Sequence, residues 1–267
     1  MTRLPYDSDV NDQEWACLEP HVAQQQGPGR KRTVNMREII NGLCYLTKTG
    51  CQWRMLPHDL PPWYHVAYYY YKWVQDGTLE YINDCLRTEI RIELGREPEP
   101  SVGIIDSQSV KTVSSGEERG FDSAKKVKGR KRHIMVDMLG LLLLVMVTAA
   151  SAQDSDVGQE LLIDVKAKTR RLKKVYADQG YKQWLVDWIA KWQDFVLELV
   201  TKPPEQHGFQ VLPKRWKVER FFGWLNNYRR LSKDYERTAE SSTGMVYLVS
   251  IQLMTRKLVR LRHNKHS

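Results

Sequence analysis

The sequence predicts an α/β protein in which an all-helical N-terminal region precedes a mixed β-sheet with helices packed on it. Three observations lead to this fold class. Apolar residues recur at helical spacing through residues 1–95, and the stretch "REPEP" then interrupts the pattern. From residue 101 onward, short β-type runs alternate with helical ones. We therefore expect two domains, a helical one at residues 1–97 and an α/β one at residues 98–267.

Helical signals come first along the chain. A first helix follows N-cap-type residues in "SDVNDQEWACLEPHV" and carries Trp15, Leu18 and Val22 on one face. A second helix, in "NMREIINGLCYLTKTG", is expected to end at Gly50, because glycine is a common C-terminal signal. After the proline-rich connector "CQWRMLPHDLPP" we expect a third helix in "WYHVAYYYYKWVQDG" and a fourth in "TLEYINDCLRTEIRIELG".

The rest of the chain alternates between strands and helices. We expect a short strand in "SVGIIDSQSV", a hairpin of "RHIMVDML" and "LLLLVMVTA" around Gly140, and strands in "KKVYADQG" and "DFVLELVT". Helices are expected in "DVGQELLIDVKAKT" and "YKQWLVDWIAKWQ", across residues 215–237, and in "SSTGMVYLVSIQLMTRKLVRLR". The order βββαβαβα indicates a mixed sheet covered by helices.

Composition argues against membrane and secreted proteins. The longest apolar run, "MLGLLLLVMVTAA", is shorter than the roughly 20 residues of a spanning helix and is better explained as a buried strand. The N-terminus has no apolar signal-peptide core, so a cytoplasmic location is expected. The cysteines form no C-x-x-C pair and have no histidine at zinc-finger spacing, so we expect reduced thiols at Cys17, Cys44, Cys51 and Cys85.

The net charge of +9 is uneven along the chain. Residues 1–100 carry 11 Lys and Arg against 14 Asp and Glu, whereas residues 101–267 carry 30 against 18. Clustered bases indicate a polyanionic partner, most often nucleic acid. A merely soluble basic protein would have the same composition, so charge leaves both interpretations open.

Three acids stand out by their positions. Asp106 ends the first expected strand, Asp178 ends the strand in "KKVYAD", and Glu219 lies inside the apolar stripe of a late basic helix. Two strand-end carboxylates can converge at one edge of a sheet, and a helix across that edge can supply a third. Such a cluster suits Mg²⁺ or Mn²⁺, which prefer oxygen ligands and support phosphoryl transfer. Acids at strand ends and in first helical turns are also common structural features.

A basic run, "AKKVKGRKRH", is expected to join two strands. Such a run lies in solvent or against a phosphate backbone, and we expect DNA backbone contacts rather than a passive loop. Beside Asp106, Ser107, Ser109 and Lys111 either touch the scissile phosphate or complete the strand. The bases of the run are Lys125, Lys126, Lys128, Arg130, Lys131 and Arg132.

The second and third helices are candidates for a helix-turn-helix-like unit, with the third helix in the major groove. Its candidate contacts are His65, Tyr69 and Lys72. The slightly acidic charge of this region argues against backbone binding, and its tyrosines could equally form a core or a dimer surface. Recognition of DNA ends and dimerisation therefore both remain possible roles.

The motifs "GIIDSQSVKT", "AKKVKGRKRHIMVD", "VYADQGY" and "VERFFGWLNNYRRL" closely resemble the DDE transposases of bacterial insertion sequences, and more narrowly the insertion sequence five group. The stretch "TGCQWRMLPHDLPPWYHV" is similar to the helical domain that precedes the catalytic core in that group. The resemblance extends from about residue 7 to residue 235.

The resemblance implies a ribonuclease-H-like catalytic core with a DDE triad of Asp106, Asp178 and Glu219. It implies that the triad binds two divalent ions, Mg²⁺ or Mn²⁺. The implied enzyme cleaves double-stranded DNA at the terminal repeats of its element and joins the freed 3′-OH to target DNA. We expect it to act as a homo-oligomer on the DNA, with no membrane partner.

The sequence also departs from the family pattern. Arg215 holds the basic position four residues before Glu219, but Asn226 stands where a basic residue is often found seven residues after it. The missing phosphate contact could come from Arg229, Arg230 or Lys233.

Two other functions compete with the transposase. One is a non-catalytic DNA-binding protein, such as a repressor derived from a transposase, and the other is a non-mobile nuclease of similar fold. The presence of all three acids and a complete core weighs against the repressor.

Overall fold

The computed structural model describes residues 3–22, 33–200 and 214–266. The chain forms two compact units. The helical unit comprises Met1–Arg96, Asn227–Ser232 and Glu240–Ser267, and the sheet unit comprises Glu97–Asn226 and Lys233–Ala239. This division differs from the single boundary expected after residue 97, because the C-terminal helix packs with the N-terminal helices.

The helical unit contains the helices predicted for the first part of the chain. Asn11 caps the first of them: its side chain accepts a hydrogen bond from the Glu14 N–H at 2.8 Å, and the Glu14 carboxylate accepts one from the Asn11 N–H at 3.1 Å. The second helix ends at Gly50 with φ of 71°, as expected. The helices are α1 (Asp12–Leu18), η1 (Glu19–His21), α2 (Met36–Thr49), η2 (Trp53–Met55), α3 (Trp63–Gln75), α4 (Thr78–Glu93), η3 (Arg229–Leu231) and α8 (Ala239–His266).

The last helix, α8, is held in the helical unit by buried polar contacts as well as by apolar packing. The Ser250 hydroxyl donates to Asn83 Oδ1 of α4 at 2.8 Å, and the Gln252 amide donates to Thr47 Oγ1 of α2 at 2.9 Å. The Tyr70 hydroxyl of α3 donates to the Ser241 carbonyl. Because buried polar groups are costly when unpaired, these contacts select one register for α8.

The connection between α2 and α3 differs from a helix-turn-helix. Residues 50–62, which include η2, separate the two helices. A helix-turn-helix joins its helices through a turn of about three or four residues. The two helices lie where the sequence predicts them, but the turn between them is too long for that motif.

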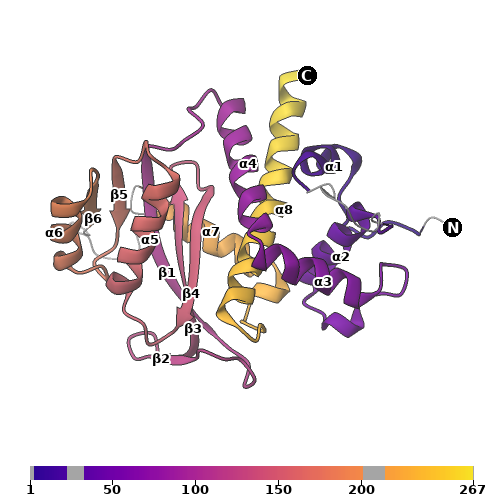
Figure 1. Cartoon of the computed structure of the whole chain (residues 1–267), viewed down its shortest axis with the longest axis horizontal. Helices are drawn as coiled ribbons and strands as arrows, with labels where there is room; N and C mark the ends of the chain where they lie inside the picture. Colours follow the sequence, from indigo (N-terminus) through magenta and orange to yellow (C-terminus); the bar gives the residue numbers. More distant parts are fainter. Residues whose placement is uncertain (1–2, 23–32, 201–213, 267) are drawn as a thin grey trace. The chain divides into compact units, whose positions relative to one another are not determined.

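The sheet unit is built on six strands within the described residues. Figure 1 shows their arrangement. The strand order is β2-β3-β1-β5-β6, and β4 pairs with β3. β1 pairs antiparallel with β3 and parallel with β5, so the sheet is mixed. The strands are β1 (Val102–Lys111), β2 (Gly120–Asp122), β3 (Val127–Asp137), β4 (Leu142–Ala149), β5 (Lys174–Ala177) and β6 (Val196–Leu199).

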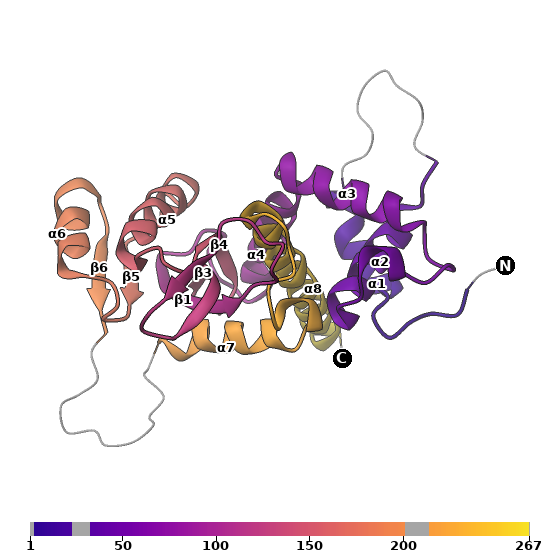
Figure 2. The same cartoon turned by 90° about the horizontal axis from the view of Figure 1, so that it is seen from below.

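Helices cover both faces of this sheet. Helix α5 (Asp154–Lys168) packs on β3 and β4, and α7 (Trp216–Asn226) packs on β1 and β3. Figure 2 shows α5 and α7 on opposite sides of the strands. Helix α6 (Gln183–Trp192) lies beside β6. This mixed sheet between helices is consistent with the ribonuclease-H-like core that the sequence predicts.

Three elements differ from the expectation. The hairpin around Gly140 is confirmed, but β3 begins at Val127, and β2 pairs with its first residues. The helix expected across residues 215–237 ends at Asn226. Beyond that end the chain pairs with β1 instead: the Asp234 N–H donates to the Lys111 carbonyl at 2.8 Å, and the Val113 N–H donates to the Asp234 carbonyl at 3.1 Å. These backbone hydrogen bonds replace those of a longer helix.

Candidate active site

Two of the three predicted acids come from neighbouring parallel strands. In the β1–β5 ladder, Ile104 lies opposite Tyr176. Asp106 is two residues beyond Ile104, and Asp178 is two residues beyond Tyr176, so the same register brings the two acids side by side. Asp106 lies in the middle of β1 rather than at its end, because β1 continues to Lys111. Its carboxylate is mostly buried, with 13% of the side chain exposed.

The third acid is carried by α7. Glu219 lies in the first turn of this helix, where a carboxylate is favoured by the helix dipole. Val218, Phe221 and Leu225 of α7 are buried. This apolar stripe fixes the helix on β1 and β3, while the Glu219 side chain remains 45% exposed.

Arg215 brings the three acids together around one cation. Its Nη2 atom lies 3.4 Å from Asp106 Oδ2, 3.7 Å from Asp178 Oδ2 and 3.6 Å from Glu219 Oε1. The sequence predicts Arg215 as a DNA contact, but the structure places its guanidinium among the carboxylates. Three acids that are far apart in the chain therefore share a single positive neighbour.

The electrostatics of the site reflect burial and crowding. Burial, followed by the charge of Asp178, raises the pKa of Asp106 to about 6, whereas Arg215 opposes the shift. The Ser107 N–H donates to Asp106 Oδ1 at 2.7 Å, and the Gly180 N–H donates to Asp178 Oδ1 at 2.9 Å. These backbone donors orient both carboxylates toward one place.

Residues beyond the predicted acids also line this region. Asp154, at the start of α5, pairs with Lys131 at 3.0 Å, and a Cβ added at Gly180 would lie 3.5 Å from Asp154 Oδ2. Tyr181 is only 1% exposed. Its pKa is raised well above the usual value by burial and by the charges of Asp106, Asp154 and Asp178. The position of Asp154 a few residues after the strand in "LLLLVMVTA" and just before the expected helix was a sequence signal that could have marked it.

The basic run between residues 125 and 132 is not the loop that the sequence predicts. β3 begins at Val127, and the side chains of Arg130 and Arg132 are fully buried, while Lys131 is 6% exposed. Burial lowers the pKa of Arg132 to about 10. The predicted DNA backbone contacts of these three residues are therefore wrong, because the side chains are buried. Lys125, Lys126 and Lys128 are exposed.

Arg130 is buried because carbonyl groups surround it. Its guanidinium donates to the carbonyls of Glu236 at 2.9 Å and Arg237 at 2.6 Å, and it pairs with Asp234 at 3.3 Å. The charge is thus compensated inside the sheet unit, and residues 233–239 are tied to β3.

The remaining predicted DNA contacts are dispersed. Ser109 donates to Asp122 at 2.5 Å, which completes the local structure of the sheet, and Lys111 is exposed at the end of β1. Arg230 is buried, donating to the Cys51 carbonyl at 3.1 Å. In the helical unit Arg229 and Lys72 are exposed and His65 is half-buried, and Lys233 is half-buried in the sheet unit.

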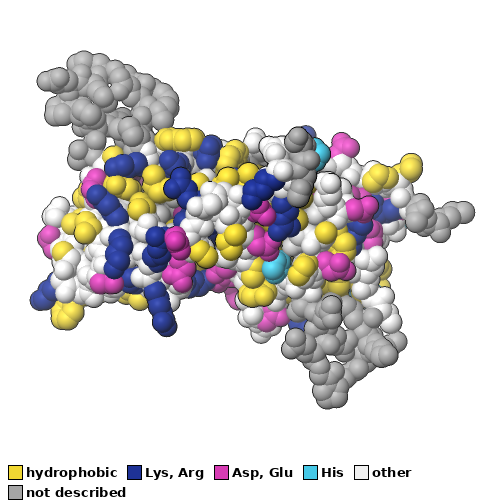
Figure 3. Space-filling view, turned by 90° about the horizontal axis from the view of Figure 1, so that it is seen from above, with side chains coloured by type: hydrophobic (Ala, Val, Ile, Leu, Met, Phe, Trp, Pro, Cys, Tyr) yellow, Lys and Arg dark blue, Asp and Glu magenta, His cyan; other side chains and the backbone are white. Residues whose placement is uncertain are grey.

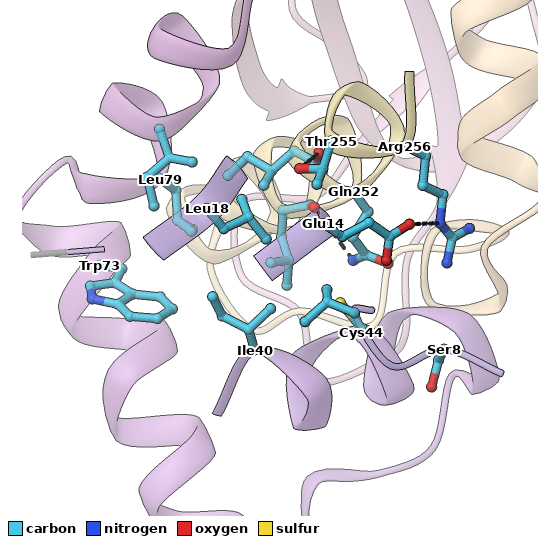
Figure 4. Close-up of a pocket in the computed structure, with 14 residues that line it drawn as sticks. Ser8, Glu14, Leu18, Ile40, Cys44, Trp73, Leu79, Gln252, Thr255 and Arg256 are labelled. Atoms are coloured by element: carbon cyan, nitrogen blue, oxygen red, sulfur yellow. Dashed lines mark hydrogen bonds and ion pairs between the residues drawn. The ribbon is translucent and has the colours of Figure 1, made fainter. Parts of the chain in front are cut away.

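The helical unit has a small cavity of its own. Figure 4 shows a cavity in the helical unit, with a volume of about 30 Å³ and a mostly apolar wall that includes Leu18, Ile40 and Trp73. Glu14 and Arg256 pair across it at 3.7 Å. That volume is close to the share of a single water molecule, so the cavity is a packing gap rather than a ligand site.

Three further observations concern the described residues as a whole. Among them, no three His, Cys, Asp or Glu side chains already stand in a metal-holding arrangement. None of the helices in the described ranges is long and apolar enough to cross a bilayer. All four cysteines are free thiols, and Cys17 and Cys44 are buried.

Known proteins match both parts of the chain. Residues 97–253 match the family model described as "Transposase DDE domain", and residues 10–83 match "Putative transposase of IS4/5 family". The chain is 34% identical over 122 residues to "Putative transposase for insertion sequence element IS402" of Burkholderia cepacia, covering 42% of this chain and 56% of that protein.

Two other relatives are more distant. "Insertion element IS402 uncharacterized 16.2 kDa protein" of Burkholderia cepacia is 25% identical over 122 residues, covering 42% of this chain and 78% of that protein. "Uncharacterized protein y4sN" of Sinorhizobium fredii is 26% identical over 84 residues, covering 32% of this chain and 67% of that protein. The match thus spans little more than half the length of the first relative.

Since the DDE family model covers more than half of the chain, the chain belongs to the DDE transposases of insertion sequences.

Proposed function

We propose that this protein cleaves DNA at the ends of its insertion sequence and joins the freed 3′-OH to target DNA by two-metal phosphoryl transfer. The observation that supports this most directly is the convergence of Asp106, Asp178 and Glu219 on one guanidinium nitrogen. Three carboxylates gathered around a single cationic atom form an oxygen-rich site with more negative charge than one arginine neutralises.

The donor set fits Mg²⁺ or Mn²⁺. These ions prefer carboxylate oxygens and keep positions for water and phosphate. Asp106, Asp178 and Glu219 would hold them, and the ions would supply activation of the attacking oxygen and stabilisation of the leaving oxygen. The position of the Arg215 guanidinium among these side chains supports a site that accepts positive charge.

The protein groups around the triad have separate tasks in this proposal. The N–H groups of Ser107 and Gly180 hold one oxygen of Asp106 and one of Asp178, which leaves Oδ2 of each acid directed to the shared cation. Lys111 lies opposite Gly129 in the β1–β3 ladder, and Lys128 immediately precedes Gly129 in β3. These two exposed bases lie at the end of β1 that follows Asp106 and would contact the DNA backbone.

The proposal is tested by neutral variants of each acid, D106N, D178N and E219Q. We expect each to lose about a thousandfold in plasmid nicking with Mg²⁺, since the metal supplies several kcal/mol and about 1.4 kcal/mol is tenfold in rate. Each should still shift DNA in a gel. The matched control is D164N, an exposed acid on α5 that should nick normally. A D178N protein that nicks at the wild-type rate would disprove the triad.

The competing functions separate in the same assay. A nuclease would nick but would not join a pre-cleaved 3′-end to target DNA, and a repressor would bind without nicking. Because two element ends are joined to one target, we also propose that at least two copies of the chain act together on the DNA.

A further inference from the structure

Arg215 lies close enough to the triad carboxylates for ion pairing, but its contacts with them have poor hydrogen-bond geometry. All three are made by one nitrogen, Nη2, at 3.4 to 3.7 Å, and only the contact with Asp106 is a hydrogen bond, at 3.4 Å. The Nε atom of Arg215 is buried and has no hydrogen-bond partner within the described structure. A well-made arginine–carboxylate pair is instead bidentate, with two short parallel bonds.

This geometry indicates a cation that is held by charge rather than by directed bonds. Asp106 and Asp178 lie side by side and Glu219 faces them, so their mutual repulsion is relieved only when a positive group lies between them. A guanidinium is planar and large, and one of its nitrogens cannot donate a good bond to three carboxylates at once. A small divalent ion carries twice the charge and accepts several oxygens at short range.

We propose that Arg215 is the internal counter-cation of the triad: its guanidinium occupies the space between the carboxylates when no divalent cation is bound, and entry of the cation displaces it. The inference rests on the proposed two-metal function. Arg215 thereby keeps the three carboxylates assembled before metal arrives, at the cost of weaker metal binding. Its role is that of a positioning residue.

The test measures Mn²⁺ binding to the full chain without DNA, by the loss of the electron paramagnetic resonance signal of free Mn²⁺. We expect R215Q to bind Mn²⁺ about tenfold more tightly than wild type, because the ion no longer has to displace a guanidinium. The matched control is K217Q, which removes the same charge two residues away. The Lys217 ammonium lies over the Trp216 ring, 5.3 Å from its centroid, rather than among the carboxylates. K217Q should change the Kd much less than R215Q does.

A second measurement guards against misfolding of R215Q. In EDTA we expect R215Q to melt at a lower temperature than K217Q, since its carboxylates have lost their counter-cation, and saturating Mn²⁺ should close this gap. R215K, which keeps the charge, should lie between wild type and R215Q in both measurements.

The outcomes separate this inference from the proposed function. If D106N abolishes Mn²⁺ binding but R215Q and K217Q bind equally, the metal site stands and the role of Arg215 is overturned. Weaker binding by R215Q would overturn it as well. If wild type binds no Mn²⁺, or D106N binds as tightly as wild type, the proposed metal site itself fails.

Discussion

Asp106 is part of the proposed metal site, and its burial has a cost in stability. Burial and the neighbouring Asp178 raise its pKa to about 6, from an ordinary value near 4. Between these two values the folded protein holds a proton that the unfolded chain has lost. The free energy of unfolding therefore falls as pH rises from about 4 to about 6, by up to about 3 kcal/mol from this group. At neutral pH the ionised Asp106 therefore lowers the stability of the folded protein.

At the residue scale, we therefore expect D106N to stabilise the protein in EDTA. Asparagine is always neutral, so it resembles the protonated acid. We expect the free energy of unfolding in urea to rise by about 2 kcal/mol at pH 8 and to change little at pH 4. The exposed D164N variant should show no such dependence on pH. An equal gain for D106N at both pH values would mean that the charge of Asp106 is not the cause.

At the element scale, β3 shows how neighbouring elements decide what a basic run does. Its first half carries four bases, but Arg130 and Arg132 are buried, and Arg130 is paired with carbonyls of residues 236 and 237. Only Lys128 of this half is exposed. In a loop, all four basic side chains could reach solvent. In this strand three of the four are buried and have a structural role.

Two helical glycines provide a prediction at this scale. A Cβ at Gly223 of α7 meets nothing within 4 Å, whereas a Cβ at Gly158 of α5 would lie 2.7 Å from Tyr181 Cε1. We expect G223A to stabilise the protein by about 0.5–1 kcal/mol, since alanine is the better helix former. G158A should destabilise it by about 1–3 kcal/mol through overpacking. Urea unfolding measures both, and a stabilised G158A would show that α5 shifts easily away from Tyr181.

At the scale of the whole molecule, the excess of bases lies in residues 101–267, with 30 Lys and Arg against 18 Asp and Glu. On the face drawn in Figure 3, Lys and Arg side chains are spread over the sheet unit, at the left of the view, with some Asp and Glu among them. Since Arg130, Lys131 and Arg132 are buried, the exposed basic surface is smaller than the charge count indicates.

We expect phosphate contacts from the exposed bases at the triad end of the sheet. Replacing Lys111, Lys126 and Lys128 with Gln should weaken binding to any duplex and lower the log–log salt slope by roughly 0.9 for each lost contact. Binding is measured on random DNA across a salt series. The control replaces Arg170 and Arg171, exposed bases that precede β5 and so lie at its opposite end from Asp178. A larger loss of slope in the control would place the DNA elsewhere.

The helical unit yields a different expectation. If α3 reads bases through His65 and Lys72, changing both to Ala should lower the preference for terminal-repeat DNA over random DNA. The expected loss is about 1–3 kcal/mol for each lost base contact. Competition binding with the two DNAs measures this preference. An equal loss of affinity on both would favour the alternative in which the tyrosine-rich helix forms a dimer surface.

The sequence by itself determined which segments are helices and strands in most places, the site of the hairpin at Gly140 and the end of α2 at Gly50. It also determined the family, through long motifs that include all three acids. These features depend on the local spacing of apolar residues and on the conformational preferences of single residues. Both can be recognised from residues that are close together in the sequence.

Only the tertiary structure decided which charged side chains are buried and which groups they pair with. Arg130 is buried because carbonyls about a hundred residues later surround it, and Arg215 lies among three acids that come from two strands and a helix. Helix α8 joins the N-terminal helices through buried bonds to Thr47 and Asn83. In each case the decisive free energy is the pairing of a buried polar group with a distant partner, and local sequence does not specify which partner the fold supplies.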